Sequence, residues 1–306
     1  MSRLDPSREL RDFLDAIEAR TETPRDCESG LPGRQRISHR SFDSRPPEKP
    51  EIEREPSAVH SRSARAVYYD GDRGYTVSAS EIRSMVELGK FRAISETDLG
   101  NYLYGGERKL LKRDIQNLDR QGLVQSGRFE DSQGLSRTLL TLSKRGNRLL
   151  KANRMVARDQ VIYSGFVRPR EANHDADLYH LYQKEAARIK QKGGRIRRVV
   201  LDFEITRKVN RDLAKLGGEV RPEIAAWHGL QVVRNKIPIP DMQIEYETRD
   251  GDAARVNLEL VTEHYRGRQM AEKARAGFSL YTPRGEGDKL RRVLDQQKLT
   301  AEILSL

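Results

Sequence analysis

Apolar and polar residues are spaced along residues 75–157 in a pattern that predicts short helices and strands. The predicted elements are helices over 80–88, 96–103 and 107–121, and strands at 91–94, 123–124 and 138–142. In the third helix, Leu111, Ile115 and Leu118 fall on one face. The Gly105-Gly106 pair separates that helix from the one before it. The pattern therefore predicts a small α+β domain.

Residues 158–306 predict a second, α/β domain. Its expected helices cover 175–191, 209–216, 222–228, 263–276 and 289–306, and its expected strands cover 197–203, 242–246, 255–261 and 278–281. The turn Asp250-Gly251-Asp252 joins the second and third of these strands into a hairpin.

Residues 1–74 differ from the rest of the chain. They are rich in Arg, Ser, Pro and Glu and poor in apolar residues, apart from one short segment around Leu10 and Ile17. Such a composition buries too little apolar surface to offset the entropy cost of ordering, so we expect a disordered arm. The arm holds 14 basic and 15 acidic residues, so the positive net charge of the chain, +11 in all, comes from the two predicted domains.

A basic chain of 306 residues with a pI near 9.7 suits a polyanionic partner, with nucleic acid first. A membrane is disfavoured because no apolar run approaches transmembrane length. Cys27 is the single cysteine, which excludes an internal disulfide framework. The N-terminus carries acids and lacks an apolar signal region, so we expect a cytoplasmic protein.

The third predicted helix carries donors on the face opposite its apolar residues. Lys109, Arg113, Gln116 and Arg120 form one stripe, and Lys112 adds a further cation. A helix that reads DNA needs an apolar face to hold it and a donor-rich face for phosphates and base edges. The alternative is an ordinary solvated face. Arg128 and Arg137 flank the turn of the following hairpin and are candidates for the same contact.

Helix, turn, basic helix and hairpin is an order that resembles the winged helix-turn-helix domains of the MarR and PadR type. The segment Leu142-Ser143-Lys144-Arg145-Gly146 resembles their strand-to-helix exit. The resemblance implies double-stranded DNA as the partner. Regulators of this type often form homodimers, and the final helix over 289–306 could serve that purpose or pack on its own domain.

In the second domain, Pro240-Asp241 and Glu259-Leu260-Val261 look like the PD-(D/E)xK nuclease signature. The order of elements resembles restriction-endonuclease-like folds and, more loosely, replication-relaxation proteins of bacterial mobile elements. Two carboxylates on adjacent strands suit Mg²⁺, which is held by few carboxylates and keeps several waters. The resemblance implies Asp241 and Glu259 as metal ligands and catalytic residues, with Mg²⁺ as the cofactor only if the site is active.

Val261 departs from that signature, because the lysine of the family is expected there. Lys273 or Gln269 on the following helix could replace it, and without such a replacement the site is inactive. The alternative for the carboxylates is structural, since a Pro-Asp pair is a frequent turn and a strand glutamate is often a surface residue.

We therefore predict a DNA-binding protein of a bacterial plasmid or mobile element, acting in replication, mobilisation or regulation. Its three parts are a disordered arm (1–74), a winged helix-turn-helix domain (75–157) and an α/β nuclease-like domain (158–306) that is degenerate at the lysine position. The alternative is a Mg²⁺-dependent DNA endonuclease targeted by its winged helix.

Overall fold

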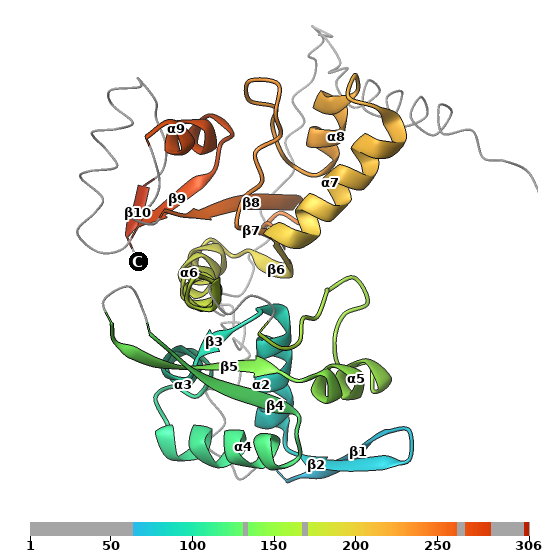
Figure 1. Ribbon diagram of the computed structural model, residues 1–306, viewed down its shortest axis with the longest axis vertical. Helices are drawn as coiled ribbons and strands as arrows, with labels where there is room; N and C mark the ends of the chain where they lie inside the picture. The colour runs from blue at the N-terminus through green and yellow to red at the C-terminus, as the bar shows by residue number, and fades with distance from the viewer. Residues whose placement is uncertain (1–63, 131–133, 167–170, 262–266, 283–302, 306) are drawn as a thin grey trace, which may run out of the picture. The chain divides into compact units, whose positions relative to one another are not determined.

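The computed structural model describes residues 64–130, 134–166, 171–261, 267–282 and 303–305 (Figure 1). All of them belong to the second of two compact units into which the chain divides, residues 56–306. This unit is α+β, with two- and three-stranded antiparallel sheets and a mixed five-stranded sheet.

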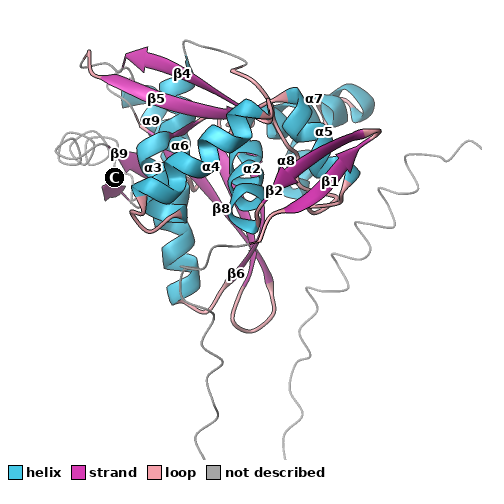
Figure 2. Cartoon of the chain, turned by 90° about the horizontal axis from the view of Figure 1, so that it is seen from below, coloured by secondary structure: helices cyan, strands magenta, loops and turns pink. Residues whose placement is uncertain are grey.

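The first part of the unit is built around a three-stranded sheet. Its elements are β1 (Ala66–Asp70), β2 (Arg73–Val77), α2 (Ala79–Lys90), β3 (Ile94–Ser95), α3 (Glu96–Leu103), α4 (Arg108–Arg120), β4 (Val124–Glu130), β5 (Ser136–Leu142) and α5 (Lys144–Ala152). The sheet has the order β3-β5-β4 and is antiparallel throughout. Figure 2 shows the β4–β5 ribbon beside α3 and α4, whose contacts with these strands hold the two helices in place.

Serine caps set the starts of three helices in this part. Ser78 Oγ accepts a hydrogen bond from the Glu81 amide, and the Glu81 carboxylate accepts one from the Ser78 amide, so α2 begins with a capping box. Ser95 Oγ accepts the Asp98 amide at 3.0 Å and starts α3. Ser143 Oγ does the same for Gly146 at the start of α5. Each cap satisfies an amide that the helix itself leaves without a partner.

The disordered arm that the sequence predicts is too long at its C-terminal end. It is expected to run to residue 74, but β1 and β2 form a regular hairpin from Ala66 to Val77. Tyr75 and Val77 from this hairpin are buried in the core, and β1 contacts α5. Packing on a helix gives a two-stranded hairpin the support that it lacks alone. The rest of the expected arm, residues 1–63, lies outside the described residues.

The second part of the unit is built around the five-stranded sheet. Its elements are α6 (Ala172–Gln191), β6 (Arg195–Leu201), α7 (Asp202–Leu216), α8 (Arg221–Trp227), β7 (Met242–Glu247), β8 (Ala253–Leu260), α9 (Gly267–Arg275), β9 (Ser279–Thr282) and β10 (Ile303–Ser305). The strand order is β10-β9-β8-β7-β6. Strands β6, β7 and β8 are antiparallel, whereas β9 runs parallel to both β8 and β10.

Helices cover both faces of this sheet (Figure 1). Leu178 and Leu181 of α6 share one hydrophobic cluster with Ile244 and Leu258. Residues from α7, α8 and α9 form a second cluster with Val200, Val261 and Leu280. Helix α6 also contacts β3, β4 and β5, and the rings of Phe91 and Tyr179 pack edge to face at 5.1 Å. The two parts of the unit therefore share a core.

Two expected elements differ from the structure. A final helix is expected over 289–306, but Ile303–Ser305 is a strand that pairs with β9, so the prediction is wrong at this end. Residues 283–302 lie outside the described residues. The strand expected through Phe203 ends at Leu201, and α7 begins at Asp202. Asp202 and Glu204 therefore lie in the first turn of a helix, where acids offset the positive end of the helix dipole.

Candidate functional site

Helix α4 presents the predicted donor face to solvent. The exposed residues on it are Lys109, Lys112, Arg113, Gln116 and Arg120. Leu111 and Leu118 are buried on the opposite side, and Ile115 packs against the same core. The helix thus has an anchored apolar side and a cationic outer side.

A buried carboxylate fixes the rotation of α4. The Asp114 side chain is 0% exposed and accepts hydrogen bonds from Ser80 Oγ at 2.6 Å and Tyr104 Oη at 3.3 Å. Arg113 adds Nε and Nη2 donors at 3.1 and 2.9 Å. Burial raises the pKa of Tyr104, which keeps its hydroxyl protonated as a donor. These bonds tie α4 to α2 and to the end of α3.

The two hairpin arginines differ in their surroundings. Arg128 is exposed on β4. Arg137 on β5 is 25% exposed, and its guanidinium lies 2.8 Å from Asp177 of α6 and 3.8 Å from Asp98. Both carboxylates compete with any phosphate for the Arg137 guanidinium, whereas Arg128 has no such neighbour among the described residues.

The structure brings together Asp241, Glu259 and Lys273. The β7–β8 register pairs Met242 with Leu258, which places Asp241 beside Glu259 at the start of β7. The Asp241 amide donates to Glu259 Oε2 at 3.2 Å, and the Leu260 amide donates to Asp241 Oδ2 at 2.9 Å. Lys273 Nζ, from α9, lies 2.7 Å from Glu259 Oε1 and also donates to the Ile239 carbonyl.

Burial gives this cluster its electrostatic character. The Glu259 side chain is 0% exposed and that of Lys273 is 20% exposed, so their charges interact with little screening by water. The Val261 side chain, directly after the same strand, is buried in the apolar cluster and contributes no charge. A cation therefore reaches Glu259 from the neighbouring helix instead of from its own strand.

His174 is a further neighbour of this cluster. It lies in the first turn of α6, with Nε2 3.7 Å from Asp241 Oδ1. Burial alone would lower the pKa of His174, but the bond to Asp241 and the charges of Asp241, Asp175 and Asp177 raise it to about 9. His174 is thus a cation beside Asp241 at neutral pH. No local pattern could have shown this, since it depends on how α6 packs.

Arg92 links the same region to the first part of the unit. Its guanidinium lies 2.8 Å from Asp202 and 3.4 Å from Asp175, and Asp175 is next to His174. Burial raises the pKa of Asp175 to about 6, while Arg92 opposes that shift. The Asp202 amide donates to the Asp241 carbonyl at 3.0 Å, so this ion-pair group adjoins the start of β7.

Glu185 is a further buried acid of α6, and it lies apart from this cluster. It is on α6, three turns after His174, which is about 16 Å along a helix. Its carboxylate accepts from Tyr281 Oη at 2.6 Å and from Arg188 at 3.0 Å. Glu185 therefore belongs to a separate pocket, described below.

The donor set at Asp241 and Glu259 fits a hard cation only in part. Two adjacent carboxylates suit Mg²⁺, which keeps several of its waters. Within the described ranges, however, no group of three or more His, Cys, Asp or Glu side chains is arranged to hold a metal ion. A Mg²⁺ ion at this place would therefore have Asp241 and Glu259 as its carboxylate ligands and no third side chain of these types among the described residues.

No protein-family model matches the chain, and no curated protein matches it. Among the helices that the structure describes, none is long and apolar enough to cross a membrane.

Proposed function

We propose that this protein binds double-stranded DNA through the exposed cationic face of α4. The observation that carries the proposal is the pairing of that face with a buried one: five donor side chains lie in solvent, while Leu111, Asp114 and Leu118 are held in the core. A helix that is anchored on one side and cationic on the other can enter a groove without unfolding.

The order of elements supports a winged-helix arrangement. Helix α3 and α4 are joined by the tight Gly105-Gly106 turn, and the β4–β5 hairpin follows α4 directly. In such an arrangement α4 takes the place of the recognition helix and the hairpin that of the wing, with Arg128 at the backbone of the DNA. Arg137 is left out of this contact because its partners lie on α3 and α6.

By resemblance to replication-relaxation proteins, we place this binding in replication, mobilisation or regulation of a bacterial plasmid or mobile element. The test of binding itself is fluorescence anisotropy with a labelled 30-base-pair duplex, titrated at several salt concentrations. The proposal is supported if the logarithm of the association constant falls linearly with the logarithm of the salt concentration, with a slope of about 0.9 per phosphate contacted. Absence of binding at low salt contradicts it.

A Mg²⁺-dependent DNA endonuclease is the second candidate, and the convergence of Asp241, Glu259 and Lys273 favours it. We expected that Val261 leaves the site without its cation unless the next helix supplies one, and Lys273 Nζ lies 2.7 Å from Glu259. Asp241 and Glu259 would hold Mg²⁺, which supplies positive charge to the scissile phosphate when bound. The Lys273 ammonium would orient the attacking water and stabilise charge on the phosphate oxygens as the P–O bond breaks.

This second candidate is tested with supercoiled plasmid and pure protein in Mg²⁺ or Mn²⁺. Nicking that is lost in Asp241→Asn and in Lys273→Met, while both variants still bind DNA, supports the enzyme. No nicking by protein that binds DNA supports a nuclease-like domain without activity.

A further inference from the structure

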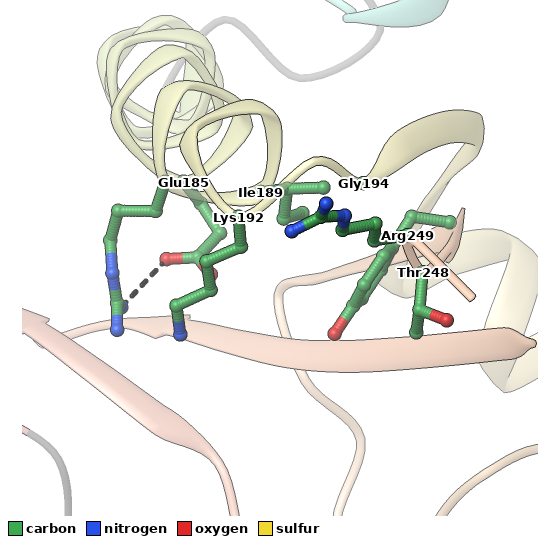
Figure 3. Close-up of a pocket in the computed structure, with 8 residues that line it drawn as sticks. Glu185, Ile189, Lys192, Gly194, Thr248 and Arg249 are labelled. Carbon is green, nitrogen blue, oxygen red and sulfur yellow. Dashed lines mark hydrogen bonds and ion pairs between the residues drawn. The ribbon is translucent and has the colours of Figure 1, made fainter. Parts of the chain in front are cut away.

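A cavity of about 130 Å³ lies between the C-terminal end of α6 and the turn after β7 (Figure 3). The residues that matter for its chemistry are Glu185, Arg188, Lys192, Tyr246, Thr248 and Arg249. It is much smaller than pockets for drug-sized ligands, which have about 300–1,000 Å³, but it has room for one tetrahedral oxyanion.

The lining of this pocket is positively charged. Three cations face a single carboxylate, and that carboxylate is already held by Arg188 at 3.0 Å and by the Tyr281 hydroxyl at 2.6 Å. Lys192 and Arg249 are exposed, and their side chains have no hydrogen-bond or ion-pair partner among the described residues. Thr248 Oγ1 accepts the Asp252 amide, which leaves its hydroxyl proton available to donate.

Lys192 and Arg249 come from different elements, and both line the pocket (Figure 3). Gly193 makes this approach possible: it has a positive φ of 80°, and a Cβ there would lie 3.2–3.4 Å from Cβ, Cγ and Cδ of Arg249. The Arg249 stem therefore lies over the end of α6, and its guanidinium extends toward the helix.

Compensation of the helix dipole accounts for only part of this arrangement. Basic residues in the last turn of a helix, such as Arg188, offset the negative end of the dipole. Arg249 lies outside the helix, in the turn after β7, and dipole compensation does not require it. Together with Lys192 it adds more positive charge than the C-terminal end of the helix and Glu185 neutralise.

We propose that this pocket binds one phosphate group of a nucleic-acid backbone, through Lys192, the Arg249 guanidinium and the Thr248 hydroxyl. A compact ammonium and a planar fork of N–H donors are the groups that bind phosphate best. The inference rests on the proposed function for its source of phosphate. Tyr246 lies at the opposite end of β7 from Asp241, about 17 Å away at the rise of a strand, so the pocket is a separate point of contact.

The experiment compares Lys192→Gln/Arg249→Gln with a matched control, Lys190→Gln/Arg195→Gln, in the anisotropy assay with the 30-base-pair duplex. The control removes two exposed cations of the same neighbourhood that do not line the pocket. We expect the pocket variant to lose roughly tenfold in affinity or more and to reduce the salt slope by about 1, and the control to lose less on both measures. Urea melting of both variants shows that each is folded.

Equal losses in the two variants would overturn the inference, because the pocket would then contribute only general charge. If charge reversal on α4 abolishes binding and the pocket variant binds as tightly as the wild type, the inference fails while the proposed function stands. Inorganic phosphate, titrated by calorimetry, forms the second arm. If the wild type binds inorganic phosphate but no DNA, and the pocket variant binds neither, then free phosphate is the ligand, and both the nucleic-acid source and the proposed function are wrong.

Discussion

Lys273 Nζ on α9 lies 2.7 Å from Oε1 of Glu259 on β8, where the side chain of Glu259 is fully buried. A buried carboxylate without a cation is costly, so this contact ties the helix to the strand whether or not the site has an activity. It is also the contact on which the second candidate function depends.

Removal of the lysine charge is expected to destabilise the protein. In Lys273→Met the Glu259 carboxylate stays buried without its cation, and breaking a buried ion pair costs about 3–5 kcal/mol. The double variant Lys273→Met/Glu259→Gln should recover part of the loss, because the uncompensated charge is gone. Urea unfolding followed by circular dichroism measures both, and a single variant as stable as the wild type would rule out a strong pair.

Charge reversal on α4 is expected to abolish DNA binding without affecting the fold. Lys109 and Arg120 are exposed, and among the described residues neither side chain has a hydrogen bond or ion pair to another element, so Lys109→Glu/Arg120→Glu should unfold at the same urea concentration as the wild type. Its affinity for the duplex should fall by more than roughly 100-fold at low salt, since attraction becomes repulsion at two phosphate contacts.

The matched control for that variant is Arg207→Glu/Lys215→Glu on α7. These two cations are also exposed, and the substitution changes the net charge equally. If the control lost as much affinity as the α4 variant, the effect would come from overall charge and not from the α4 face.

Asp114 is expected to act on stability, although it lies on the proposed recognition helix. Asp114→Ala removes the buried carboxylate that accepts from the hydroxyls of Ser80 and Tyr104, at a cost of about 1–3 kcal/mol. Asp119→Ala, at an exposed position on the same helix, should change stability by less than about 0.5 kcal/mol. Thermal melting of the two variants checks the contrast; equal melting temperatures would mean that Asp114 does not anchor α4.

His174 is expected to give the protein a pH-dependent stability. Its pKa of about 9 in the folded protein exceeds the usual 6.5, so the folded state holds the proton more tightly than the unfolded chain does. The stabilisation is complete below about pH 6.5 and is lost as the pH rises through 9. The difference in urea midpoint between wild type and His174→Gln should shrink over that range, and a constant difference would contradict the assignment. Asp241→Asn should lower the pKa of His174, as measured by NMR.

The pattern of the sequence alone determined the type of most elements from α2 to β9 and the two sides of α4. Helical and strand periodicities are local, because side chains of a helix repeat every 3.6 residues and those of a strand every two. The same local pattern separated Lys109 and Arg120 from Leu111 and Leu118 before any packing was known.

Only the tertiary structure decided which distant residues meet. The sequence offered Lys273 and Gln269 equally as replacements at Val261, and the packing of α9 on β8 places Lys273 at Glu259. In the sequence, Arg128 and Arg137 both flank the turn of the hairpin. In the structure, Asp177 of α6 forms an ion pair with Arg137 and not with Arg128. Glu185 and His174 share a helix, but the helix rise separates them into two sites. Sheet order and helix docking set these contacts, and local periodicity does not encode either.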